Sequence, residues 1–160
     1  KGNPNKFELP KPIINKGGCN LSFAGLKTAI LRITKKIKTE QEKFDLAASF
    51  QKTIEEILYI KTKVAFEEFR KIKSQDRSSF VVAGGVAANK GIKEKLLEMC
   101  EKNKFECLFP DISLCSDNAA MIALTGCFRY QDGIMNDNYE IKINPRWSIE
   151  NIYASESLGG

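Results

Sequence analysis

The chain has 160 residues, of which 42% are hydrophobic and 28% are charged, and it carries a formal net charge of +5. This composition excludes a disordered tail, a collagen and a small disulfide scaffold, and no apolar run of 18 residues predicts a membrane-spanning helix. The sequence contains no histidine, so the chain cannot supply a Ser-His-Asp or Cys-His catalytic set, or a histidine-based zinc site. The mild positive charge permits a phosphate-rich partner without requiring one.

The first 20 residues are rich in proline and glycine and predict an extended lead-in rather than a domain. No methionine and no structural element precede them, so we expect a fragment boundary here. Apolar residues then recur every three or four positions across 22–37, and again across 42–72. These periods predict two helices, the second of which contains no proline or glycine that would break it.

The period changes at residues 80–83, a short apolar run that predicts a buried strand of a parallel sheet. Asn89 is a plausible N-cap for a helix to Met99. A second strand is expected at 105–109, and Ser116 or Asp117 is expected to cap a helix that ends near Tyr130, before Gly133. The class is therefore α/β and helix-rich, with a parallel strand pair too small to be a complete sheet, so we expect further strands upstream.

The chain has five cysteines, an odd number, and no two of them form a Cys-x-x-Cys motif. Both observations argue against a metal or disulfide framework. We interpret them as reduced cytosolic thiols, several of them buried, and expect a cytoplasmic protein.

Gly84 and Gly85 separate the first predicted strand from the helix that Asn89 begins. Glycines let a ligand approach the backbone, and a helix N-terminus favours anions, so this loop suits a nucleotide. In open α/β sheets, ligands lie beyond the carboxyl ends of the strands. The alternative is a tight strand-to-helix turn in which Asn89 only caps the helix. Asp117 has the same two interpretations, a metal ligand or a helix cap.

Five segments occur together in one order: 22–29 (SFAGLKTA), 47–51 (AASFQ), 82–89 (VAGGVAAN), 115–123 (CSDNAAMIA) and 144–147 (NPRW). They resemble the TsaD family, the tRNA N6-adenosine threonylcarbamoyltransferases formerly labelled O-sialoglycoprotein endopeptidase or glycoprotease. Residues 2–4 (GNP) and 9–12 (LPKP) also fit its pattern. The likeness runs nearly end to end and corresponds to the C-terminal part of the family's chain.

The resemblance implies an actin/Hsp70-like (ASKHA) fold, with residues 21–147 as the C-terminal part of a lobe and 148–160 as a tail. It implies transfer of threonylcarbamoyl from threonylcarbamoyl-adenylate to N6 of adenosine 37 of ANN-decoding tRNA. The implied partners are the N-terminal lobe of the same protein, tRNA and small proteins of the same modification pathway, with no membrane. Without the N-terminal lobe, we expect this chain to be inactive.

By the same resemblance, Gly84, Gly85 and Asn89 bind the nucleotide, which is ATP, AMP or threonylcarbamoyl-adenylate, and Asp117 is a metal ligand. The implied metal is a single iron or zinc ion, whose two histidine ligands belong to the part of the family's chain that this sequence lacks. We expect neither ligand to be held tightly by this chain alone. Ala24 departs from the family's usual serine, which puts in doubt any hydroxyl contact there.

Two other functions stay open. The chain could be a non-catalytic nucleotide-binding or partner-docking module of the same superfamily, which apolar stripes exposed on the first two helices would favour. The older family label would make it a metalloendopeptidase, but the sequence contains no His-Glu-x-x-His motif.

Overall fold

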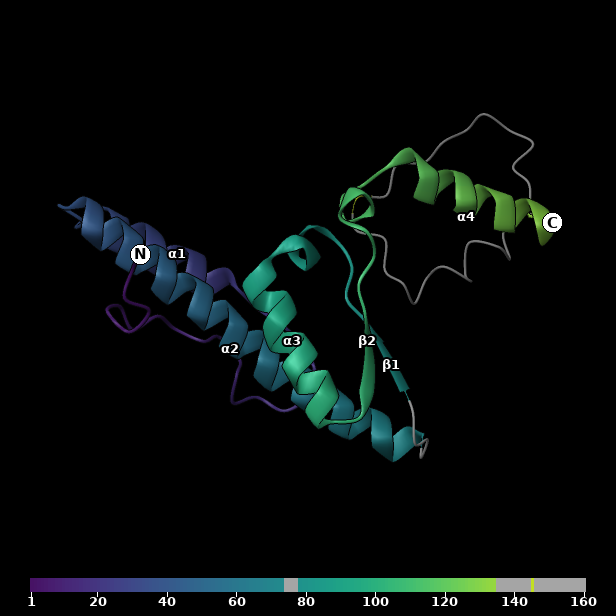
Figure 1. Ribbon diagram of the computed structural model, residues 1–160, viewed down its shortest axis with the longest axis horizontal. Helices are drawn as coiled ribbons and strands as arrows, with labels where there is room; N and C mark the ends of the chain where they lie inside the picture. The colour runs from purple at the N-terminus through teal and green to yellow at the C-terminus, as the bar shows by residue number, and fades with distance from the viewer. Residues whose placement is uncertain (74–77, 135–144, 146–160) are drawn as a thin grey trace. The chain divides into compact units, whose positions relative to one another are not determined.

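Helices dominate the computed structural model, which describes residues 1–73, 78–134 and 145 (Figure 1). The chain divides into two compact units, Lys1–Asn118 and Ala119–Gly160. The described helices and strands follow one another as α1 (Ala24–Thr34), α2 (Glu40–Ile72), β1 (Ser78–Val81), the 3-10 helix η1 (Gly85–Ala88), α3 (Lys90–Lys102), β2 (Phe105–Leu108), the 3-10 helix η2 (Ile112–Leu114) and α4 (Ala119–Gln131). The predicted α/β class with a parallel strand pair is confirmed.

The long helix α2 begins at a capping box, in which the side chains of Thr39 and Glu42 satisfy each other's backbone N–H groups. This fixes its start two residues earlier than the periodicity predicted, and it runs unbroken to Ile72 as expected. The preceding helix α1 is shorter than predicted, since it ends at Thr34. Ile37 continues the apolar period beyond that end because it packs against the same cluster as α1.

Residues 1–20 form no helix or strand, but they are docked on α2. Leu9 is buried in a cluster with Leu26 of α1 and with Leu46 and Ile57 of α2. The Asn3 backbone N–H donates to the Asp45 carboxylate at 2.7 Å. The lead-in is therefore an integral layer of the first unit. The predicted boundaries at 20 and 147 stay predictions, and the 148–160 tail lies outside the described residues.

A second cluster joins α2 to α3 and the strands. Phe66 of α2 is buried with Leu96 and Met99 of α3, and its ring stacks on Phe105 of β2 at 3.8 Å between centroids. This core fixes α3 against α2 and the strand pair, and so fixes where the loop between β1 and α3 must lie.

The strand pair is parallel, with Ser78 opposite Phe105 and Val81 opposite Leu108. The first strand begins two residues before its predicted position, although the Val82 N–H still donates to the Leu108 carbonyl at 3.0 Å. Phe80 packs on the core, whereas Val81 is 63% exposed. The expectation of a strand buried on both faces is therefore wrong for the described part of the chain, since no described element covers its second face.

The helix α4 begins at Ala119, directly after Asn118, so neither Ser116 nor Asp117 immediately precedes it. It ends at Gln131, one residue beyond the predicted end near Tyr130, and Gly133 follows with a φ of +73°, the left-handed conformation typical of the residue just after a helix. The predicted element after Gly133 and the segment around Trp147 lie outside the described residues, apart from Pro145. No helix in the described ranges combines the length and apolarity needed to cross a bilayer.

Candidate nucleotide half-site

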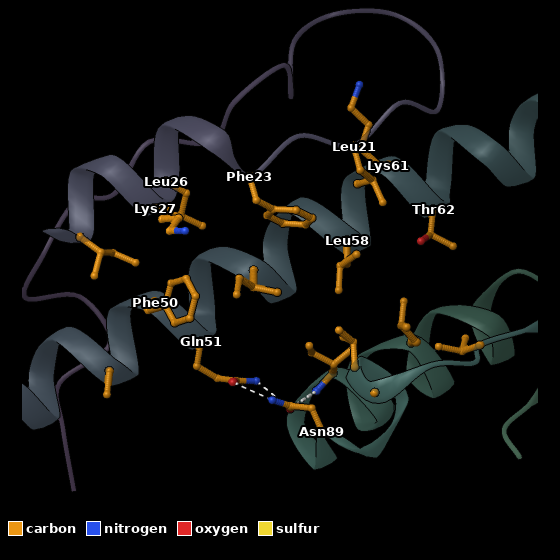
Figure 2. Close-up of a pocket in the computed structure, with 18 of the residues that line it drawn as sticks. Leu21, Phe23, Leu26, Lys27, Phe50, Gln51, Leu58, Lys61, Thr62 and Asn89 are labelled. Atoms are coloured by element: carbon orange, nitrogen blue, oxygen red, sulfur yellow. Dashed lines mark hydrogen bonds between the residues drawn. The ribbon is translucent and has the colours of Figure 1, made fainter. Parts of the chain in front are cut away.

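A wide, open hollow of about 1230 Å³ lies in the first unit (Figure 2). Its walls come from α1, α2, the end of β1, η1 and the N-terminal half of α3, and most of the side chains are apolar. Among the described residues, the charged side chains that line it are lysines: Lys27, Lys43 and Lys61. An apolar hollow with a few polar groups, and with positive charge only, is suited to an anion that carries an apolar or aromatic part.

The loop that carries Gly84 and Gly85 follows β1 after two residues, and Gly85 lines the hollow. Gly84 has a φ of +82°, a conformation that side-chain-bearing residues rarely adopt. A Cβ added to either glycine would meet nothing within 4 Å, so the space in front of both residues is open. The loop therefore lies at the carboxyl end of a parallel strand, where α/β proteins bind ligands, and it leaves room for a ligand to reach the backbone.

Asn89 caps α3, which confirms one of the two roles that the sequence predicted for it. Its Oδ1 accepts the backbone N–H of Ile92 at 3.1 Å, which satisfies one of the free donors of the helix N-terminus. The side chain is half-buried and lines the hollow together with Gly85. Capping and ligand contact are therefore compatible at this position, because only part of the amide is used by the cap.

Asn89 also forms a reciprocal pair with Gln51 of α2, drawn with dashed lines in Figure 2. Gln51 Nε2 donates to Asn89 Oδ1 at 2.9 Å, and Asn89 Nδ2 donates to Gln51 Oε1 at 3.0 Å. Gln51 Nε2 also donates to the Glu55 carboxylate at 2.7 Å. Two of the segments that carry the family resemblance, 47–51 and 82–89, thus meet in one hydrogen-bonded network.

Gly91 makes this contact possible. A Cβ at position 91 would lie 2.5 Å from Glu55 Oε1, closer than real Cβ atoms approach, and 3.0 Å from Gln51 Nε2, which is a tight contact. Any side chain there would push the ends of the Gln51 and Glu55 side chains out of the positions in which they form these hydrogen bonds. Glycine in a helix costs about 1 kcal/mol relative to alanine. The close contact between the start of α3 and α2, which this glycine allows, offsets that cost.

The sequence patterns did not predict Gln51, Glu55 or Gly91 as site residues. A Gln-Glu pair four residues apart on a helix is a signal for a side-chain hydrogen bond, and a glycine just inside a helix is a signal for close packing. Neither local signal indicates that Gln51 contacts Asn89, because the two residues are 38 positions apart in the sequence.

Lys61 fixes another wall of the hollow. It is buried, and its Nζ donates to the carbonyls of Lys16 and Gly18 at 2.7 and 3.1 Å. A buried ammonium requires hydrogen-bond acceptors, and these carbonyls tie residues 16–18 to α2. Its side chain is one of the three lysines that line the hollow.

Asp117 does not line the hollow, and its side chain is exposed in the turn before α4. The described residues contain no group of three or more carboxylate, cysteine or histidine side chains that could hold a metal. Iron and zinc sites require three or four ligands. The described residues therefore do not by themselves fit the implied metal, and Asp117 can contribute one ligand at most.

The cysteines are free thiols. Cys100 and Cys115 are buried, as the sequence predicted for several of them, and burial, together with the hydrogen bond between the Cys100 thiol and Cys107 that favours the protonated form, raises the pKa of Cys100 to about 12. Cys100 is thus a neutral core thiol of α3 and not a nucleophile.

The sequence matches the family model described as TsaD, tRNA N6-adenosine threonylcarbamoyltransferase, over residues 1–124. A relative of that name from Pelagibacter ubique is 61% identical over 150 residues, and one from Rickettsia massiliae is 44% identical over 155. Each match covers 94% of this chain but only 42% and 44% of the relative, respectively, so the chain spans less than half the length of these proteins. The extent of the family match, which includes both the 47–51 and the 82–89 segments, shows that the chain belongs to the TsaD family.

Proposed function

We propose that this chain is the C-terminal part of an enzyme that transfers threonylcarbamoyl from threonylcarbamoyl-adenylate to N6 of adenosine 37 of ANN-decoding tRNA. Its first unit belongs to an actin/Hsp70-like lobe and supplies one side of the nucleotide cleft. The other side comes from the N-terminal lobe, and tRNA and small proteins of the same pathway complete the system in the cytoplasm.

The observation that carries this proposal is the loop of residues 84–89. It follows a parallel strand, has open space in front of both glycines, and ends at the N-terminus of a 13-residue helix. Free backbone N–H groups and the positive end of the helix dipole stabilise phosphate at such a position. The sugar and base of the adenylate then extend into the apolar hollow beside Asn89.

In this arrangement the chain binds and orients the adenylate, and the second substrate is held elsewhere. Gly84 and Gly85 let the phosphate reach the backbone, and Asn89 offers a side-chain donor. Asp117 supplies one ligand to a divalent iron or zinc ion whose other ligands lie outside this chain. Since half a cleft cannot orient both substrates or exclude water, the isolated chain is inactive.

The test is a transfer assay with tRNA transcript and threonylcarbamoyl-adenylate, in which the modified nucleoside is quantified by mass spectrometry. We expect product from the complete enzyme in the presence of its partners, and none from residues 1–160 alone. In the complete enzyme, Asp117→Ala should lose bound metal and activity together. Product from the isolated chain, or stoichiometric metal in the Asp117→Ala enzyme, would contradict these assignments.

A partner-docking module is the second candidate, because apolar side chains are exposed on the first two helices. Phe23 at the N-cap of α1 and Phe50 and Phe69 on α2 are each more than one-third exposed. The same side chains would also serve the enzyme, as contacts for its N-terminal lobe. Sequencing upstream of this chain separates the two, since only the enzyme requires a histidine-bearing half.

A further inference from the structure

The hydrogen-bond network of Gln51, Glu55 and Asn89 has a fixed direction. At one end, the Glu55 carboxylate can only accept, so the group of Gln51 that faces it must be the NH₂. At the other end, the Ile92 backbone N–H can only donate, so the group of Asn89 that faces it must be the oxygen. Neither amide can therefore be turned around without opposing two donors or two acceptors.

This direction determines what Asn89 can offer to a ligand. Its oxygen already accepts two hydrogen bonds, from Gln51 Nε2 and from the Ile92 N–H. Its nitrogen donates once, to Gln51 Oε1, and an amide nitrogen carries two hydrogens. Within the described ranges the second N–H has no protein partner, and the side chain lines the hollow.

We propose that Gln51 is a positioning residue that holds Asn89 as a hydrogen-bond donor, so that the bound nucleotide must present an acceptor oxygen or nitrogen to it. This inference rests on the proposed nucleotide site and specifies its chemistry. Gln51 itself uses both N–H groups inside the protein, on Glu55 and Asn89, and acts on the ligand only through Asn89.

The test is the dissociation constant of AMP for the complete enzyme, measured by calorimetry well below the unfolding temperature of every variant. Asn89→Asp keeps an acceptor for the Ile92 N–H but removes the donor, and should weaken AMP binding at least about tenfold. Gln51→Ala removes one of the two contacts that hold the Asn89 amide in place and leaves only the Ile92 N–H to orient it, and it should weaken binding by about three- to tenfold. On an Asn89→Ala background, Gln51→Ala should add less than about a twofold change.

Gln41→Ala is the matched control. Gln41 lies on the same helix and donates to Asp45 in the same i, i+4 arrangement, at 2.9 Å, but it does not line the hollow. It should leave AMP affinity unchanged. A merely structural role for Gln51 would lower the unfolding temperature and leave the AMP dissociation constant unaffected.

The outcomes separate the inference from the proposal beneath it. If the wild-type enzyme binds AMP but Asn89→Asp binds equally well, or if the effects of Gln51→Ala and Asn89→Ala add fully, the positioning role is overturned and the nucleotide site stands. If the wild-type enzyme binds neither AMP nor threonylcarbamoyl-adenylate, the nucleotide site is overturned and the positioning role falls with it.

Discussion

Two glutamine–carboxylate pairs on α2 have the same local pattern and opposite surroundings. Gln41 donates to Asp45 at 2.9 Å, and Gln51 donates to Glu55 at 2.7 Å, each four residues along the helix. Around the first pair, Asp45 accepts the Asn3 N–H at 2.7 Å, and Gln41 donates to the Lys1 carbonyl at 3.2 Å. Around the second pair, the partner is the side chain of Asn89.

The two pairs differ in whether the residue that each one contacts keeps a free hydrogen-bonding group for a ligand. The first pair binds two backbone groups, the Lys1 carbonyl and the Asn3 N–H, so it only docks the N-terminal segment. The Asn89 amide retains an N–H at the edge of an open hollow, so the second pair docks α3 and leaves a donor for a ligand. The same helical motif therefore produces a structural contact in one place and, in the proposed nucleotide site, a binding contact in the other.

The largest expected effect comes from Gly91→Val, which breaks the second contact. The new side chain would collide with the ends of Gln51 and Glu55, so the hydrogen bonds that join Gln51 to Glu55 and Asn89 are lost. We expect AMP affinity to fall at least about tenfold and the free energy of unfolding to fall by about 1–3 kcal/mol. Calorimetry and urea unfolding measure the two losses, and normal AMP affinity in this variant would contradict the network's role.

Gly2→Ala breaks the first contact in the corresponding way. A Cβ at Gly2 would overlap the backbone carbonyl of Phe44, so residues 1–3 must lift from α2. We expect a loss of about 1 kcal/mol in unfolding free energy and faster tryptic cleavage after Lys6, with AMP affinity unchanged. A change in AMP affinity would mean that the two contacts are coupled along α2.

The smallest effect is an acid dependence of the first contact. The N–H of Asn3 and the amide of Gln41 lower the pKa of Asp45 below its ordinary 3.8. A carboxyl group with a lowered folded-state pKa stabilises the fold above its ordinary pKa, and this contribution is lost as the pH falls through the lowered value. Asp45→Asn should therefore show a shallower loss of stability below about pH 4 than the wild type does, in urea unfolding across pH. Parallel curves for the two proteins would contradict this assignment.

Local pattern predicted much of this fold. The apolar period and the absence of proline and glycine predicted a continuous α2, and Asn89 caps α3 as its position before an apolar stripe indicated. The strand at 80–83 was displaced because its apolar run continues past the ladder into the wall of the hollow. The 3-10 helices η1 and η2 were not predicted, since turns of three or four residues are too short to show a period.

The sequence predicted the loop glycines and Asn89 as nucleotide-binding residues, and Gly85 and Asn89 do line the hollow, while their contact with a nucleotide stays a prediction. The contact with Gln51 could not be predicted, because it depends on how α3 packs against α2 through Phe66 and Met99. Nothing in the 47–51 segment indicates which of its residues turns toward the loop. That information comes only from tertiary packing.

The most direct measurement compares AMP binding by the complete enzyme and its Gly85→Leu and Gly17→Leu variants. Both glycines have open space around them and neither has a left-handed φ, so both variants should keep the wild-type unfolding temperature. Only Gly85→Leu fills the space in front of the loop. We expect it to weaken AMP binding at least about tenfold, with Gly17→Leu unchanged. Wild-type AMP affinity in the Gly85→Leu enzyme would contradict the nucleotide site.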